Sequence, residues 1–138
     1  MSDPCTAPEP PSSEVITETV PPPAKAADAR AVAAAFVAAL DPPPSPTAVQ
    51  DLLLLVSELV TNAVRHAGSV TALAFGADRK ALYVQVADPS PERPKQRVPD
   101  LTGAGGGFGW PLVLRLAGKV TVRNDTGAGK VILATMPR

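Results

Sequence analysis

Four polar side chains that could bind charged ligands occur close together, between Glu58 and His66. Glu58 and Asn62 are four residues apart and His66 lies four residues after Asn62, so on a helix they share one face or its border, together with Arg65. A carboxylate, an amide oxygen, a cation and an imidazole at this spacing suit a hydrated Mg²⁺ ion beside a polyphosphate. The alternative is structural: Glu58 and Arg65 form a solvated stripe, and Arg65 and His66 complement the negative end of the helix dipole.

A second candidate is Asp88, which ends an apolar run and is followed by Pro89-Ser90-Pro91. Its carboxylate can accept hydrogen bonds from an exocyclic amine such as that of adenine. An aspartate in this setting also initiates turns, so a purely structural role is the alternative.

The third candidate is a glycine cluster over residues 103–109, directly before a predicted helix. The candidate phosphate-binding residues in this cluster are Gly105, Gly106, Gly107 and Gly109. Backbone amides without side chains at the start of a helix can cradle phosphates. The cluster is not a Walker loop, because no Lys-Ser/Thr pair follows, and it does not complete G-x-G-x-x-G. A flexible hinge is the alternative.

The apolar pattern predicts the elements that position these candidates. Helices are expected over 24–40, from Ser45 as N-cap to Gly68, and from Pro111 to Gly118. Strands are expected at 14–20, 70–75, 81–87, 120–124 and 130–136. Because most of these strands come as hairpins, the sequence predicts an α/β (α+β) two-layer sandwich. Its sheet is expected to be mixed and mostly antiparallel, with about three helices on one face.

Composition narrows the class of protein. The 138 residues carry 13 Lys+Arg and 13 Asp+Glu, which fits one domain over 13–138 without the basic surface that direct nucleic-acid binding needs. Residues 1–12 are Pro-rich and are expected to be a disordered tail. Cys5 is the single cysteine, so no intrachain disulfide forms. No export signal is present and the apolar run 52–56 is too short for a membrane span, so a cytoplasmic protein is expected.

The order of the three candidates resembles the GHKL ATPase superfamily, which includes gyrase, heat-shock chaperone ATPases and histidine kinases. The string Ser57-Glu-Leu-Val-Thr-Asn62-Ala-Val-Arg-His-Ala67 is similar to the N box of bacterial anti-sigma factor serine/threonine kinases and their actinobacterial ATP-binding relatives. The resemblance covers about residues 24–137 and implies the histidine-kinase-type ATPase fold.

The resemblance also implies roles for the candidates, with ATP and Mg²⁺ as ligands. Asn62 would ligate Mg²⁺, Glu58 would be the general base toward an incoming serine hydroxyl, and Asp88 would recognise the adenine amino group. Arg65 and His66 would contact phosphate. The second glycine box, which holds phosphate, would consist of Gly105, Gly106, Gly107 and Gly109.

The chain departs from the family pattern in two places. The usual Asp-x-Gly-x-Gly is here Asp88-Pro89-Ser90-Pro91-Glu92. The threonine that often stands early in the family's last strand is replaced by Val131, which follows Gly129-Lys130.

Two classes of function follow. The first is an ATP-binding regulator of the anti-sigma factor type, which binds a sigma factor or phosphorylates a serine or threonine of an antagonist protein. Such kinases often dimerise, so a homodimer is an expectation. The second is a non-catalytic interaction module on the same fold, with weak or no nucleotide binding. A protein that simply docks through its Ala-rich helix would show no nucleotide effect.

Overall fold

The computed structural model describes residues 16–92, 109–124 and 129–138. The predicted tail over 1–12 and the glycines Gly105, Gly106 and Gly107 lie outside these described residues.

A five-stranded sheet in the order β1-β2-β3-β5-β4 forms one layer of the molecule. Its strands are β1 (Ile16–Val20), β2 (Ala72–Ala77), β3 (Ala81–Asp88), β4 (Lys119–Asn124) and β5 (Lys130–Pro137). A tight turn joins β2 to β3, and only antiparallel strands can share such a turn. All four described strand pairings are antiparallel, in agreement with the mostly antiparallel sheet that the sequence predicts.

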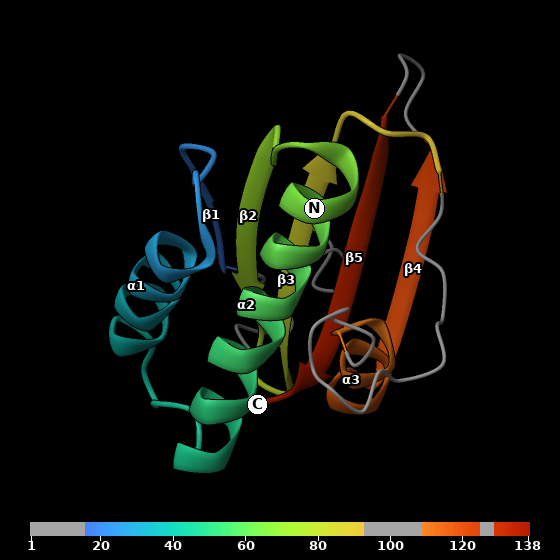
Figure 1. Cartoon of the computed structure of the whole chain (residues 1–138). Helices are drawn as coiled ribbons and strands as arrows, with labels where there is room; N and C mark the ends of the chain where they lie inside the picture. Colours follow the sequence, from blue (N-terminus) through green and yellow to red (C-terminus); the bar gives the residue numbers. More distant parts are fainter. Residues whose placement is uncertain (1–15, 93–108, 125–128) are drawn as a thin grey trace, which may run out of the picture.

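Three helices cover one face of this sheet and form the second layer (Figure 1). They are α1 (Ala26–Ala38), α2 (Pro46–Ala67) and α3 (Gly109–Leu116). The α2 helix lies across the middle of the sheet, with α1 and α3 on its two sides (Figure 1). The predicted two-layer fold is therefore confirmed.

Local sequence signals fix both ends of α2. The Ser45 hydroxyl oxygen accepts a hydrogen bond from the Ala48 backbone N–H at 3.1 Å, and Pro46 occupies the first helical position. Gly68 ends the helix in the left-handed conformation, at φ 90°, and its N–H donates to the Val64 carbonyl at 3.1 Å. Only glycine adopts this conformation at low cost, so the sequence stops the helix at that residue.

By length and composition alone, α2 is apolar enough to cross a membrane. The central helix of a soluble domain passes the same test. Here α2 contacts α1, α3, β3 and β5. Its buried residues are Ala48, Leu52, Leu55, Val56, Leu59, Val60 and Ala63.

Alternation along β3 and β5 decides which side chains face the helices. Leu82, Val84 and Val86 are buried in β3 and pair in register with buried residues of β5. Continuing this phase to the end of β3 places Asp88 on the same helix-covered face, directly opposite Lys130. The hydrophobic core thus ends in a charged pair at one end of the sheet.

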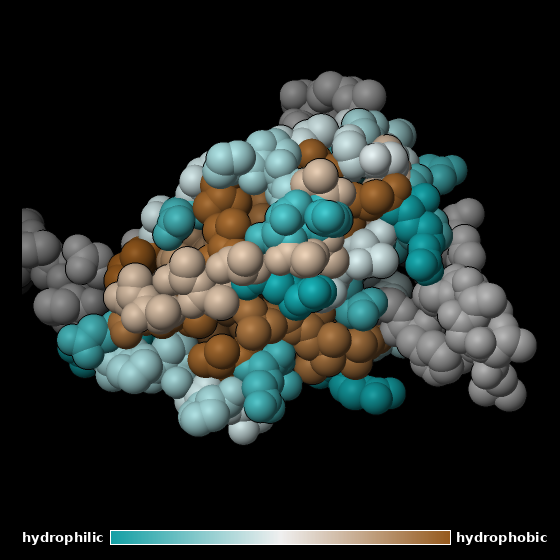
Figure 2. Space-filling view, turned by 60° about the vertical axis from the view of Figure 1, so that its left-hand side comes forward, coloured by the Kyte–Doolittle hydropathy of each residue, from teal (hydrophilic) through white to brown (hydrophobic). Residues whose placement is uncertain are grey.

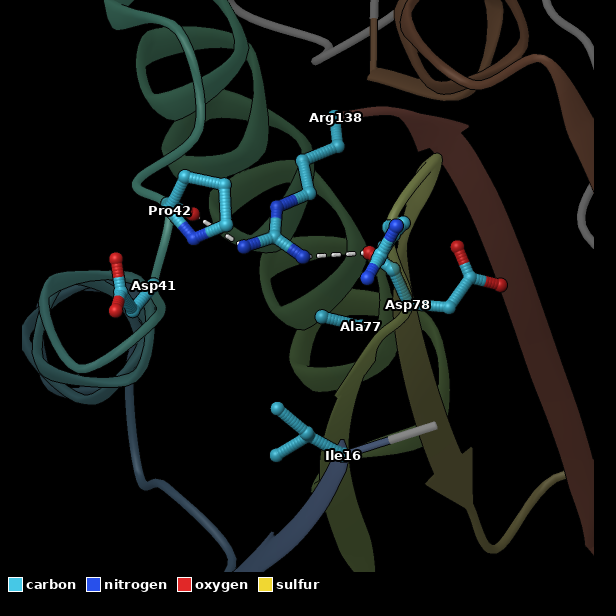
Figure 3. Close-up of a pocket in the computed structure, with 7 residues that line it drawn as sticks. Ile16, Asp41, Pro42, Ala77, Asp78 and Arg138 are labelled. Carbon is cyan, nitrogen blue, oxygen red and sulfur yellow. Dashed lines mark hydrogen bonds between the residues drawn. The ribbon is translucent and has the colours of Figure 1, made fainter. Parts of the chain in front are cut away.

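At the opposite end of the sheet, Arg138 links three segments by hydrogen bonds (Figure 3). The guanidinium donates hydrogen bonds to the backbone carbonyls of Pro42 and Asp78, and the Arg138 backbone N–H donates to the Lys80 carbonyl. A pocket of about 440 Å³ lies beside these contacts and is lined also by Ile16. One side chain therefore joins the α1–α2 connection, the β2–β3 turn and the end of β5.

Figure 2 views the molecule from the α1 side, where polar residues are interspersed with apolar ones and a band of weakly apolar surface crosses the face. The exposed positions of α1 are mainly alanines, which accounts for a surface of this character. The exposed alanines of α1 are Ala27, Ala31, Ala34, Ala35 and Ala38.

Candidate functional site

The end of the sheet where β3 stops and β5 starts holds a buried ion pair. Among the residues that the structure describes, Asp88 and Lys130 are the only fully buried charged or polar side chains, at 1% and 3% exposure. Lys130 Nζ lies 3.0 Å from both carboxylate oxygens of Asp88. Burying two charges is costly unless each has partners, so this pair is the strongest candidate for a functional group in the described sheet.

Local backbone geometry holds Asp88 in place. The Ser90 backbone N–H donates to Asp88 Oδ1 at 2.9 Å, which is the turn geometry that an Asp-Pro-Ser sequence favours. A Cβ atom on Gly129 would collide with the backbone carbonyl of Asp88, so only glycine lets β5 approach β3 this closely. The structural role predicted for Asp88 is therefore real, and the side chain also faces the helices.

The two oxygens of Asp88 differ in their hydrogen bonds. Oδ1 accepts from Ser90 N and from Lys130 Nζ. Oδ2 lies within ion-pair distance of Nζ but accepts no hydrogen bond of acceptable direction, although it is buried. The ammonium group neutralises the charge beside Oδ2, and this oxygen can still accept a hydrogen bond from a ligand.

Glu58 and Asn62 lie around α2 from the residue that contacts α1. Arg30 of α1 donates from Nη1 to Ser57 Oγ at 3.0 Å, so Ser57 marks the side of α2 nearest α1. Successive residues turn by about 100° around a helix, which puts Glu58 about 100° and Asn62 about 140° from Ser57. Both side chains are half-buried. At these angles they border the stripe of buried residues of α2 that includes Leu55 and Leu59.

Arg65 and His66 are both exposed near the end of α2. Arg65 lines a groove of about 340 Å³ with Lys25, at the start of α1, and with Thr61 and Val64. The predicted phosphate contacts of Arg65 and His66 stay predictions.

Of the four candidate glycines, only Gly109 lies within the described residues, where it is the first residue of α3. Within the described ranges no three His, Cys, Asp or Glu residues gather closely enough to hold a metal ion. No described hydrogen bond or ion pair joins Glu58 or Asn62 to the Asp88–Lys130 pair.

Sequence reasoning missed Lys130. The comparison with the family pattern singled out Val131 on this strand, but strand alternation turns Val131 toward the other face of the sheet, opposite Ala87. Lys130 is the residue that pairs with Asp88. The signal was available: Lys130 is in phase with the apolar residues Ile132, Ala134 and Met136, which marks it as inward-facing.

A family model described as "Histidine kinase-like ATPase domain" matches residues 20–136. The chain belongs to this family. The match runs from the end of β1 to within β5 and so includes the whole helical layer and the Asp88–Lys130 pair. It confirms the GHKL-type superfamily predicted from the sequence, whereas the narrower resemblance to anti-sigma factor kinases stays a prediction. No curated protein matches the chain.

Membership in the histidine kinase-like ATPase family implies ATP as a ligand, usually with Mg²⁺. The residues present fit such a ligand. Asp88 Oδ2 is a buried acceptor without a hydrogen bond, suited to an exocyclic amine. Asn62 offers an amide oxygen, which Mg²⁺ accepts as a ligand, on a half-buried side of α2.

Proposed function

We propose that this protein is an ATP- and Mg²⁺-binding regulator of the anti-sigma factor type, located in the cytoplasm. It phosphorylates a serine or threonine of an antagonist protein, binds a sigma factor, or does both. The observation that carries the nucleotide part is the buried Oδ2 atom of Asp88, which accepts no hydrogen bond and faces the helical layer. The partner part rests on the resemblance of residues 57–67 to the N box of anti-sigma factor kinases.

In this proposal Asp88 and Asn62 bind the ligands, and Glu58 takes up a proton. Asp88 accepts a hydrogen bond from the adenine amino group, and Asn62 ligates Mg²⁺, which neutralises phosphate charge when bound. Glu58 lies one helical turn before Asn62 on the same side of α2. Its carboxylate accepts the proton of the serine hydroxyl as the phosphoryl group is transferred.

The buried ion pair favours a second candidate function, a non-catalytic interaction module. Lys130 already neutralises Asp88, so the carboxylate has a charged partner without any nucleotide. In that case nucleotide binds weakly or not at all, and the fold serves only to present a surface to a partner protein.

Thermal unfolding with ATP, with and without Mg²⁺, tests the nucleotide site. A ligand at 100 times its dissociation constant adds about 2.7 kcal/mol to the free energy of unfolding, which corresponds to roughly 5–10 °C in a domain of this size. We expect such a shift for the native chain, and we expect Asn62→Ala to remove its Mg²⁺-dependent part. Thr61→Ala changes the neighbouring half-buried residue and is expected to keep the full shift. No shift at millimolar ATP would favour the interaction module.

Phosphoryl transfer to a panel of anti-sigma antagonist proteins tests the role of Glu58. Glu58→Gln removes the proton acceptor, so we expect transfer to fall at least a hundredfold while ATP still raises the melting temperature. The matched control is Asp51→Asn, which neutralises a half-buried carboxylate two turns earlier on the same side of α2 and is expected to leave transfer unchanged. Loss of ATP binding in Glu58→Gln would contradict a role limited to proton transfer.

A further inference from the structure

The Asp88–Lys130 pair leaves one donor and one acceptor side by side. A lysine ammonium carries three N–H donors. Lys130 Nζ donates to Asp88 Oδ1 at 3.0 Å and to the Ser90 carbonyl at 3.3 Å, which leaves one N–H without a described hydrogen bond. The adjacent Asp88 Oδ2 accepts none. These two atoms face the helical layer from adjacent strands.

We propose that Lys130 is a second base-recognition residue, which donates its remaining N–H to the N1 atom of adenine while Asp88 Oδ2 accepts from the 6-amino group. This inference rests on the proposed function, because it needs a nucleotide at this site. Adenine carries its amino donor and its N1 acceptor next to each other on one edge of the ring. The amino group can donate to Asp88 Oδ2, and N1 can accept from the remaining N–H of Lys130.

Guanine matches the pair less well. Its corresponding edge presents the O6 acceptor, the N1–H donor and the 2-amino donors, and a carboxylate facing it would use both oxygens. Asp88 Oδ1 already accepts from Ser90 N and Lys130 Nζ, so only Oδ2 is available. Guanine could place O6 at Lys130 and N1–H at Oδ2, but its 2-amino group would then find no acceptor on the pair.

A purely structural role for Lys130 makes a different prediction. As a neutralising partner, Lys130 only offsets the charge of Asp88, and its removal leaves a buried unpaired carboxylate that destabilises the fold. Such a role would not distinguish two nucleotides that differ at N1. Dependence of affinity on the N1 atom is thus the readout that separates base recognition from charge neutralisation.

The test compares ATP with 1-deaza-ATP, in which a C–H group replaces N1, by calorimetric titration of the full chain with Mg²⁺. One hydrogen bond from a charged donor corresponds to about a ten- to hundredfold change in dissociation constant. We expect the native chain to bind 1-deaza-ATP weaker by that factor. Lys130→Met should bind both nucleotides equally, whereas Lys119→Met, at an exposed lysine of β4, should keep the difference. Discrimination that persists in Lys130→Met would overturn the inference.

The comparison on the native chain needs no variant, so it stands even where Lys130→Met fails to fold. The double variant Asp88→Asn with Lys130→Met removes both charges and supplies a second protein on which to measure the loss of discrimination. If the native chain binds neither nucleotide, the proposed function fails and this inference fails with it. If it binds both with equal affinity, the nucleotide site stands and the role of Lys130 alone is overturned.

Discussion

At the scale of single residues, the site depends on a close approach of two backbones. Gly129 precedes β5, and a Cβ atom there would collide with the Asp88 carbonyl and come near Pro89 Cα. The obstacle is backbone, which cannot rotate away as a side chain can. The identity of residue 129 therefore controls the pairing of Asp88 with Lys130, although a glycine contributes no functional group.

Gly129→Ala tests this dependence. We expect it to lower the free energy of unfolding by about 1–3 kcal/mol, because the strands must separate to admit the methyl group. It should also weaken any ATP-dependent stabilisation. Gly118→Ala is the matched control, since its Cβ would lie 3.6 Å from the Thr135 carbonyl, an ordinary contact, and we expect a change within about 0.5 kcal/mol. Urea unfolding measures both, and equal effects of the two variants would contradict the argument.

The sequence also shows, residue by residue, what can be predicted. Ser45, Pro46 and Gly68 are local signals whose effect does not depend on the rest of the fold, and they define α2 correctly. Lys130 is different, because a lysine on a strand is usually solvated and only its pairing with Asp88 makes burial tolerable. That pairing joins residues 42 positions apart, and it follows from the register of β3 with β5 rather than from either segment alone.

At the scale of elements, the difference between local signals and strand pairing explains the boundaries of β2. The β-prone run predicts a strand over 70–75, whereas β2 spans Ala72–Ala77. Gly76 and Ala77 have little intrinsic strand preference, but they pair with β1 on one side and β3 on the other. Pairing partners extend the strand at one end, which no local propensity could reveal.

The turn between β2 and β3 is stabilised by Asp78. Its carboxylate accepts from the Tyr83 hydroxyl at 2.5 Å and from the backbone N–H groups of Lys80 and Ala81, each at 2.8 Å. The Tyr83 hydrogen bond is the main cause that lowers the pKa of Asp78 below its usual 3.8, and partial burial opposes it. The same hydrogen bond raises the pKa of Tyr83 above its usual 10.0.

These shifts predict how Tyr83→Phe depends on pH. A lowered carboxyl pKa contributes stability that is present above the unfolded-state pKa and is lost as the pH falls through the folded-state pKa. A raised tyrosine pKa contributes stability that is lost as the pH rises through the folded-state value. We therefore expect Tyr83→Phe to lower the free energy of unfolding by about 1 kcal/mol near pH 7 and by less near pH 3.

Urea unfolding at the two pH values measures this difference. Thr135→Val is the control, because Thr135 lies opposite Tyr83 on β5, and the effect of this substitution should not change with pH. An identical cost of Tyr83→Phe at pH 3 and pH 7 would show that Asp78 is not the partner that matters.

At the scale of the whole molecule, the two ends of the sheet differ in their polar contacts. The end at Asp88 and Lys130 carries a buried ion pair and an acceptor without a hydrogen bond, and it is the end where we propose that nucleotide binds. The other end is tied by Arg138, which joins the carbonyls of Pro42 and Asp78. Because the two ends lie at opposite ends of β3 and share no described hydrogen bond, stability and ligand binding should be separable by mutation (Figure 1).

Arg138→Ala tests that separation. Loss of the hydrogen bonds to two carbonyls should lower the free energy of unfolding by about 1–2 kcal/mol. The additional stabilisation by ATP should equal that of the native chain, because distant and independent sites are additive. Arg79→Ala, at an exposed arginine that lines the same pocket, should change neither quantity. A smaller ATP effect in Arg138→Ala would mean that the two ends are coupled through the sheet or α2, so that the tie at one end also sets the geometry of the Asp88–Lys130 pair.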